Sequence, residues 1–177
     1  MIGENEQIET SEDTEKPSFL SKARQKRFVK FAIVSAIGWG INELIVFLMM
    51  LLLDHFYTHD VLFTVWILDV EKILIAAGIA IVIVMIYNYF INKIWTFRKQ
   101  EQMVDFATLP QFLKFALVGA SGTVINLGLV HLFAVIIGWN DYLATTIGFV
   151  VSVITNFILN DIWTFNPRFG KPKTAKD

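Results

Sequence analysis

The sequence predicts an all-α membrane protein whose four transmembrane helices form two hairpin repeats of parallel topology. Hydrophobic residues make up 55% of the 177 residues, whereas charged residues make up only 18%. The apolar residues gather in four stretches, and each is close to the length of about 20 residues that a helix needs to cross a bilayer. A closely similar ending also occurs twice, because residues 87–97 return as residues 155–165. A buried helix of a soluble protein can imitate one such stretch, but not four.

The four apolar stretches are predicted to be two pairs of spans. We place the spans at residues 31–53, 73–94, 115–137 and 143–162. The segments FVKFA and FLKFA open the first and third spans, so each repeat begins alike and comprises two spans. Two spans return the chain to its starting side, and the axis relating the repeats is therefore predicted to run along the membrane normal. A site is expected where the two repeats meet.

The positive charges are distributed very unevenly between the two sides of the predicted membrane domain. This domain covers residues 28–166, between tails at residues 1–27 and 167–177. Of the 15 Lys and Arg residues, only Lys72 falls on the outer side. The positive-inside rule therefore places both termini and the middle linker in the cytoplasm. The protein is accordingly predicted to be a multi-pass protein of the cytoplasmic (inner) membrane.

The N-terminal tail is acidic first and basic afterwards. Its first 15 residues hold six acids and few apolar residues, which predicts a disordered tail. Residues 17–30 mix aromatic residues with cations, which fits either an interfacial helix on anionic lipid or a solvated basic linker. No cleavable signal peptide is expected, because the first apolar run is too long and follows a long polar segment.

The outer connection of the first repeat contains an extra segment at residues 54–72. Its aromatic residues are typical of the lipid–water interface, and we expect it to lie there as a short amphipathic helix. His55 and His59 have the spacing of neighbours on a helix and could chelate a metal, but a third ligand is lacking. We interpret them as polar loop residues, and we expect no metal or other cofactor.

Small and polar residues form matching stripes on the second and fourth spans. They recur at every fourth position, and so share one helix face: Ala76, Ala80, Val84, Asn88 and Asn92; Ala144, Gly148, Ser152, Asn156 and Asn160. Small residues allow close helix packing in lipid. An unpartnered amide in hydrocarbon costs several kcal/mol, so the four Asn residues should face protein or water. They fit either interhelical hydrogen bonds or a substrate path.

Two polar positions lie near the middle of the first and third spans. Asn42 and Asn126 occupy matching places, and Glu43 lies about 20 Å beyond Lys30 along the helix. Intramembrane ionisable residues indicate a functional site, although Glu43 could also simply pair with a neighbour. The predicted polar translocation path comprises Asn42, Glu43, Asn88, Asn92, Asn126, Asn156 and Asn160.

Cations and aromatic residues recur at the cytoplasmic ends of the spans. A phosphate at the depth of the lipid headgroups would be stabilised by several cations there. The predicted lipid-phosphate site therefore comprises Lys30, Lys93, Arg98 and Lys114. The alternative is that these residues only snorkel and set topology. Four aromatic residues are predicted to lie at the membrane interface: Trp95, Phe97, Trp163 and Phe165.

The two N-x-x-x-N-x-I-W-T-F endings, with the segment FLKFALVGASGT before the second, resemble the GtrA-like family. The resemblance covers residues 28–166. The family consists of small four-span membrane proteins of polysaccharide synthesis, which are also found fused to polyprenyl-phosphate sugar synthases. The resemblance implies translocation of a polyprenyl-phosphate-linked sugar across the cytoplasmic membrane, for glycosylation of cell-surface polysaccharide or teichoic acid.

The resemblance also marks individual residues. It points to Gly119, Thr123 and Asn126 in the second repeat, whereas in the first repeat only Asn42 keeps the corresponding polar position. The family often has Arg after the second Asn of each ending, where this chain has Lys93 and Asp161. Because Asp161 inverts the charge, a symmetric pair of phosphate-binding cations is not expected, and the phosphate hypothesis rests chiefly on Lys30, Lys93 and Lys114.

No catalytic motif is visible, and we expect no enzymatic activity. One alternative function is a non-transporting anchor or activator of a polyprenyl-phosphate glycosyltransferase. Another is a small proton-coupled multidrug exporter that uses Glu43. The expected partners are a polyprenyl-phosphate sugar lipid and the membrane, and no nucleic acid is expected. A glycosyltransferase and a second copy of the chain are further candidate partners.

Overall fold

Four long helices dominate the computed structural model, which describes residues 21–65 and 68–172. They are α1 (Lys22–Phe56), α2 (Lys72–Ile91), α4 (Thr108–Val130) and α5 (Asp141–Leu159). Within the described residues, these four are long and apolar enough to cross a membrane, which confirms the predicted spans. Residues 22–30 continue directly into α1 and form no separate interfacial helix. The predictions for residues 1–20 and 173–177 lie outside the described residues.

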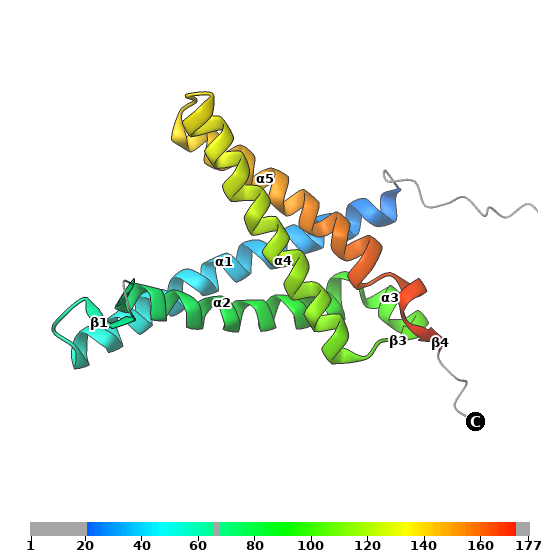
Figure 1. Ribbon diagram of the computed structural model, residues 1–177. Helices are drawn as coiled ribbons and strands as arrows, with labels where there is room; N and C mark the ends of the chain where they lie inside the picture. Colours follow the sequence, from blue (N-terminus) through cyan, green and yellow to red (C-terminus); the bar gives the residue numbers. More distant parts are fainter. Residues whose placement is uncertain (1–20, 66–67, 173–177) are drawn as a thin grey trace, which may run out of the picture.

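The long helices form two hairpins that diverge from one end of the molecule (Figure 1). In the first hairpin α1 packs against α2, and in the second α4 packs against α5. The hairpins meet where α1 and α4 begin and where α2 and α5 end. We call this the basal end, and the opposite tips of the hairpins the distal ends. Contacts between the hairpins are therefore concentrated at the basal end.

Three helices continue into π-helical turns. These are η1 (Asn92–Thr96) after α2, η2 (His131–Ile136) after α4 and η3 (Asn160–Thr164) after α5. At the start of η1, the Asn92 side-chain Nδ2 donates to the Asn88 carbonyl at 2.8 Å. The Asn160 amide at the start of η3 makes the equivalent bond to Asn156 at 2.9 Å. An Asn amide that competes for the backbone carbonyl explains why the α-helical pattern changes at these two positions.

Each hairpin is held by close contact between a glycine and an asparagine. A methyl group added to Gly38 would lie 2.6 Å from Asn88 Oδ1, and one added to Gly122 would collide with Asn156 Oδ1. The small-residue stripes lie inside the same contacts, since Ala76, Ala80 and Ala144 are fully buried. Small residues thus allow the helix backbones to approach closely, as expected for packing in lipid.

An aromatic core joins the two hairpins at the basal end. Phe97 and Phe165 are fully buried and stack with ring centroids 4.4 Å apart. Both rings therefore contact protein and not lipid, while their depth at the membrane interface stays a prediction. The backbone N–H groups of Phe97 and Phe165 bond to the carbonyls of Asn92 and Asn160, five residues earlier. This wider turn rotates the following side chain away from the direction that α-helical periodicity predicts.

The outer connection of the first hairpin is a two-stranded antiparallel sheet, not the predicted amphipathic helix. Strand β1 (Val61–Val65) pairs with β2 (Leu68–Glu71). β-Branched residues in both strands favour this structure. Directly after β2, the buried Lys72 ammonium contacts Asp54 at 2.7 Å and Asp60 at 3.6 Å. Among the described residues, the single cation near the distal ends is therefore neutralised by its neighbours.

The basal end is closed by the linker between the hairpins and by the segment after η3. The linker contains α3 (Arg98–Met103) and β3 (Val104–Asp105), and η3 is followed by the 3₁₀ turn η4 (Pro167–Phe169) and β4 (Lys171–Pro172). Strands β3 and β4 pair in antiparallel orientation. This pairing ties the linker to the C-terminal segment beneath the aromatic core.

Candidate functional site

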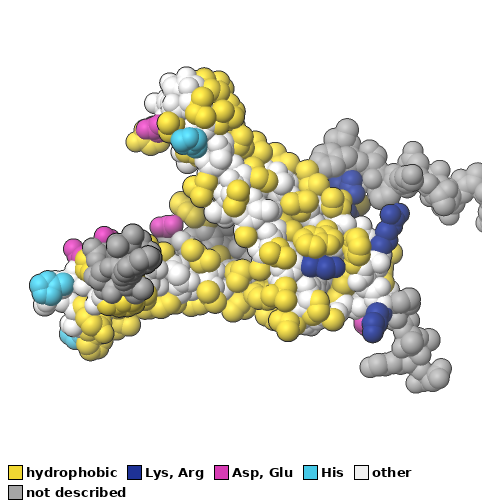
Figure 2. Space-filling view, viewed as in Figure 1, with side chains coloured by type: hydrophobic (Ala, Val, Ile, Leu, Met, Phe, Trp, Pro, Cys, Tyr) yellow, Lys and Arg dark blue, Asp and Glu magenta, His cyan; other side chains and the backbone are white. Residues whose placement is uncertain are grey.

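Positive charge is concentrated at the basal end. Figure 2 shows Lys and Arg side chains there and the acidic and His side chains mainly toward the distal ends. Among the described residues, the basal end carries eleven cations against three acids, which are Glu101, Asp105 and Asp161. An anionic group at this level is therefore favoured over a neutral or cationic one.

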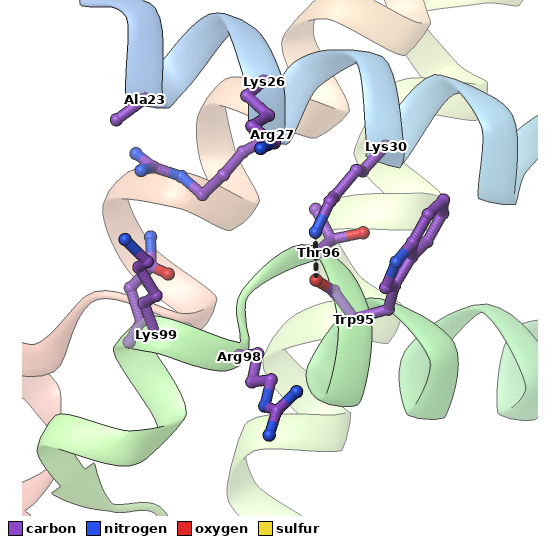
Figure 3. Close-up of a pocket in the computed structure, with 9 residues that line it drawn as sticks. Ala23, Lys26, Arg27, Lys30, Trp95, Thr96, Arg98 and Lys99 are labelled. Carbon is purple, nitrogen blue, oxygen red and sulfur yellow. Dashed lines mark hydrogen bonds between the residues drawn. The ribbon is translucent and has the colours of Figure 1, made fainter.

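A pocket of about 380 Å³ lies at the basal end of the first hairpin. We call it the first mouth, and its lining is shown in Figure 3: Ala23, Lys26, Arg27, Lys30, Trp95, Thr96, Arg98, Lys99 and Gln100. The four residues from α1 have the spacing of a single helix face. In the view of Figure 3, Lys99 extends toward α1, whereas Arg98 extends away from it. The first mouth thus brings cations of two distant segments to one cavity.

Lys30 has a fixed place at the first mouth. Its Nζ atom donates to the Trp95 carbonyl at 3.2 Å and lies 5.1 Å above the Trp95 ring. The neighbouring Thr96 side chain is 4% exposed, and its hydroxyl has no hydrogen-bond partner among the described residues. Thr96 thus lines the mouth beside a positioned ammonium group, with its hydroxyl oxygen buried.

Asp161 is a structural ion-pair partner that the sequence reasoning did not identify. Its carboxylate contacts Arg24 Nε at 2.8 Å and Arg27 Nη2 at 2.7 Å, and the Asp161 side chain is only 4% exposed. These contacts fasten the start of α1 to η3. The charge inversion relative to Lys93 was the available signal, because an acid on a strongly basic side is expected to find cationic partners.

Lys93 does not line the first mouth. Its Nζ atom donates to Gln111 Oε1 at 2.8 Å and lies 3.6 Å from Glu101 Oε2. Tyr89 Oη also donates to Gln111 Oε1, at 2.9 Å, and Gln111 Nε2 donates to Glu101. Lys93 therefore belongs to a polar network that joins the first hairpin, α3 and the second hairpin.

Lys114 lies at the basal end of the second hairpin, which we call the second mouth. Its Nζ atom is 5.5 Å from the centre of the Trp163 ring and 4.8 Å from that of Phe169. The predicted phosphate cluster is thus divided: Lys30 and Arg98 line the first mouth, whereas Lys93 and Lys114 lie elsewhere. The prediction of one shared cluster is corrected accordingly, because spacing along the sequence did not reveal how each helix is rotated.

A polar groove of about 450 Å³ runs between the hairpins. All four long helices or their π turns contribute to it, and its polar residues with hydroxyl or amide groups are Ser35, Asn42, Asn88, Asn92, Thr123, Asn156 and Asn160. Five of the predicted path residues therefore line one groove. Asn126 instead packs against Gly148 in the second hairpin. Glu43 is exposed and accepts a 3.5 Å hydrogen bond from Asn42.

The groove asparagines do not form the interhelical hydrogen bonds considered above. Asn92 and Asn160 donate within their own helices. The Oδ1 atoms of Asn88, Asn92, Asn156 and Asn160 are buried and accept no hydrogen bond from any described residue. Buried acceptors without partners are costly, and two of these oxygens, those of Asn88 and Asn156, lie against Gly38 and Gly122 inside the hairpins.

The four apolar helices, the charged basal end and the groove define a multi-pass membrane protein. The family model described as the GtrA/DPMS transmembrane domain matches residues 16–97 and 114–175. The chain belongs to this family.

One curated relative is a dolichol-phosphate mannosyltransferase from Pyrococcus furiosus. The two chains are 34% identical over 76 residues, which make up 43% of this chain and 20% of that enzyme. The match therefore covers about a fifth of the relative's length.

Proposed function

We propose that this protein moves a polyprenyl-phosphate-linked sugar between the leaflets of the cytoplasmic membrane. The observation that carries the proposal is that the first mouth adjoins the groove. On α1, Lys30 lines the mouth and its neighbour Phe31 lines the groove. On η1, Trp95 lines the mouth and Asn92 lines the groove. Family membership and the mannosyltransferase relative, which is named for dolichol phosphate, support a lipid of this class.

The first mouth would hold the phosphate at the level of the lipid headgroups. Cations stabilise a phosphate by charge-assisted hydrogen bonds, and the excess of basic residues supports a cytoplasmic position of the basal end. The sugar would then enter the groove, which is lined by amide and hydroxyl side chains. The lipid chain would remain in the bilayer.

This mechanism requires no covalent step, and we propose that the chain is not itself an enzyme. The energetic problem is the transfer of a polar sugar through hydrocarbon, where each unsatisfied polar group costs several kcal/mol. A groove lined with amides and hydroxyls lowers that barrier. The moved sugar would serve the glycosylation of polysaccharide or teichoic acid outside the cell.

Leaflet exchange in liposomes tests the proposal. Purified protein should accelerate exchange of a fluorescent polyprenyl-phosphate sugar, and Thr123→Leu, which fills the groove, should slow that exchange at least about tenfold. Thr145→Leu is the matched control, because Thr145 is exposed on α5 outside the groove. Absence of exchange by the unaltered protein would overturn the proposal.

A second candidate is a non-transporting subunit that holds the phosphate lipid for a glycosyltransferase. The relative favours it, because a mannosyltransferase contains a matching segment that makes up 20% of its length. This candidate predicts that the protein stimulates a co-purifying glycosyltransferase while producing no leaflet exchange by itself.

A further inference from the structure

We propose that the first mouth binds a group of two linked phosphates in preference to a single phosphate. The two linked phosphates could belong to a lipid diphosphate or to a nucleoside diphosphate. The inference rests on the proposed function in one respect, since it specifies the ligand of the same mouth. It is argued from the charge, the Thr96 hydroxyl and the size of the mouth.

The first mouth has more positive charge than one phosphodiester needs. Lys26, Lys30, Arg98 and Lys99 have no acidic partner within residues 21–65 and 68–172, whereas Arg27 is paired with Asp161. A phosphodiester carries a single negative charge, whereas two linked phosphates carry at least two. The charge balance therefore favours the larger anion.

Membrane topology does not explain why these cations share one cavity. The positive-inside rule depends on how many Lys and Arg residues a loop carries and not on which face they occupy. The second mouth shows the contrast at the same end of the molecule. At the positions matching Lys26, Arg27, Arg98 and Lys99 it has Pro110, Gln111, Asn166 and Pro167. The additional positive charge is therefore confined to the first mouth and is not shared by the basal end as a whole.

Thr96 supplies a second, independent observation. Its side chain lines the first mouth, is 4% exposed and has a hydroxyl without a partner among the described residues. The hydroxyl oxygen is itself buried, so it would donate to a phosphate oxygen once the Thr96 side chain turns toward the mouth. Thr164 holds the matching place in the second hairpin with its hydroxyl equally unpartnered among the described residues, but neutral residues stand there at four positions that match cations of the first mouth.

The size of the first mouth is also consistent with more than one phosphate. A volume of about 380 Å³ falls within the range of about 300–1,000 Å³ that is usual for sites of small organic ligands. Trp95 borders this space with a ring that is 40% exposed. The mouth therefore has room for the group attached to the phosphates.

Calorimetric titration of the full chain in nanodiscs of neutral lipid tests the inference. Inorganic pyrophosphate should bind about tenfold more tightly than orthophosphate at low salt, because it places more charge among the same cations. Lys26→Gln and Lys99→Gln should each weaken pyrophosphate binding about threefold. Arg168→Gln, which removes an exposed cation from the second mouth, should leave it unchanged. Equal affinity for the two anions, or an equal loss in the control variant, would overturn the inference.

Competition then identifies the source of the diphosphate. Displacement of pyrophosphate by a polyprenyl diphosphate in the nanodisc indicates a lipid ligand, and displacement by uridine diphosphate indicates a soluble one. Displacement by neither would overturn the inference. Leaflet exchange of a monophosphate lipid without any preference for pyrophosphate would refute this inference alone. A pyrophosphate preference without leaflet exchange would refute the proposed function alone.

Discussion

The two mouths at the basal end have nearly the same local sequence but different surroundings. In the first, Lys30 lies 5.1 Å above Trp95 and shares a cavity with four further cations. In the second, Lys114 lies between Trp163 and Phe169, at 5.5 and 4.8 Å from their ring centres. The turn η4 supplies Phe169, and neutral residues of α4 and of the segment that leads into η4 stand where the first mouth has four of its cations. The first mouth is therefore the more strongly charged of the two, and the lysine of the second mouth contacts two aromatic rings instead of one.

The comparison separates residues that build the scaffold from residues that provide chemistry. The glycine–asparagine contacts, the asparagine bonds at the π turns and the stacked phenylalanines occur in both hairpins. The cations of the first mouth do not. Lys93 and Asp161 occupy matching positions but join different networks. Changes in the shared residues should thus affect both hairpins alike, whereas changes at the mouths should not.

Removing either ring of the central stack should have the largest effect. Phe97→Ala and Phe165→Ala should each lower the free energy of unfolding by about 4 kcal/mol, because both rings are fully buried. Thermal unfolding in detergent measures the loss. Phe149→Ala is the control, since Phe149 is 55% exposed. A much smaller loss for one ring than for the other would break the equivalence of the two hairpins.

Breaking the Asp161 ion pairs should be nearly as costly. Asp161→Asn leaves Arg24 and Arg27 without their carboxylate, and we expect a loss of about 3 kcal/mol in the free energy of unfolding. Because Asp161 fastens α1 to η3, amide hydrogen exchange should accelerate in residues 22–30. Asp141→Asn, at an exposed position, is the control. Unaltered exchange in residues 22–30 would show that the carboxylate does not hold α1.

Filling the glycine–asparagine contacts should have a moderate effect. Gly38→Ala and Gly122→Ala should each cost about 2 kcal/mol through overpacking, as measured by the melting temperature. Gly40→Ala and Gly119→Ala are matched controls, because a methyl group at either position meets nothing within 4 Å. Similar melting temperatures for all four variants would mean that the asparagine amides move aside without cost.

Neutralising the matching lysines of the two mouths, Lys30 and Lys114, should have the smallest effect of these changes, a difference in the rate of leaflet exchange. Lys30→Gln should slow leaflet exchange about threefold at low salt, and more than Lys114→Gln does, because only Lys30 lies in the more strongly charged mouth. The difference should shrink as salt concentration rises, since screening weakens exposed charges. A larger effect of Lys114→Gln would reverse the assignment of the two mouths.

Much of the fold could be predicted from the sequence. Long apolar stretches and the two matched endings can each be recognised within one continuous segment, without knowing which distant residues it contacts. The four helices and the faces that carry Ala76 and Ala144 follow directly from periodicity. The outer sheet was missed because its aromatic residues suggested an interfacial helix, although Val61 and Val65 favour a strand. The burial of Phe97 and Phe165 was not predicted, because the π turns change the helical phase just before them.

The site could be predicted only in part, because it depends on contacts between distant segments. The groove asparagines were recognisable from their regular spacing. The rotation of each helix at the basal end was not, and Lys93 therefore proved to be a partner of Glu101 and Gln111. The partners of Asp161 lie more than 130 residues away along the chain, beyond the reach of any local pattern.

The position of the lipid phosphate tests the central claim most directly. A structure of the protein in a nanodisc with a polyprenyl-phosphate sugar would locate the phosphate relative to the two mouths. We expect phosphate density at the first mouth, within contact of Lys30 and beside Thr96, and none at the second mouth. Density beside Lys114, or equal density at both mouths, would contradict that claim.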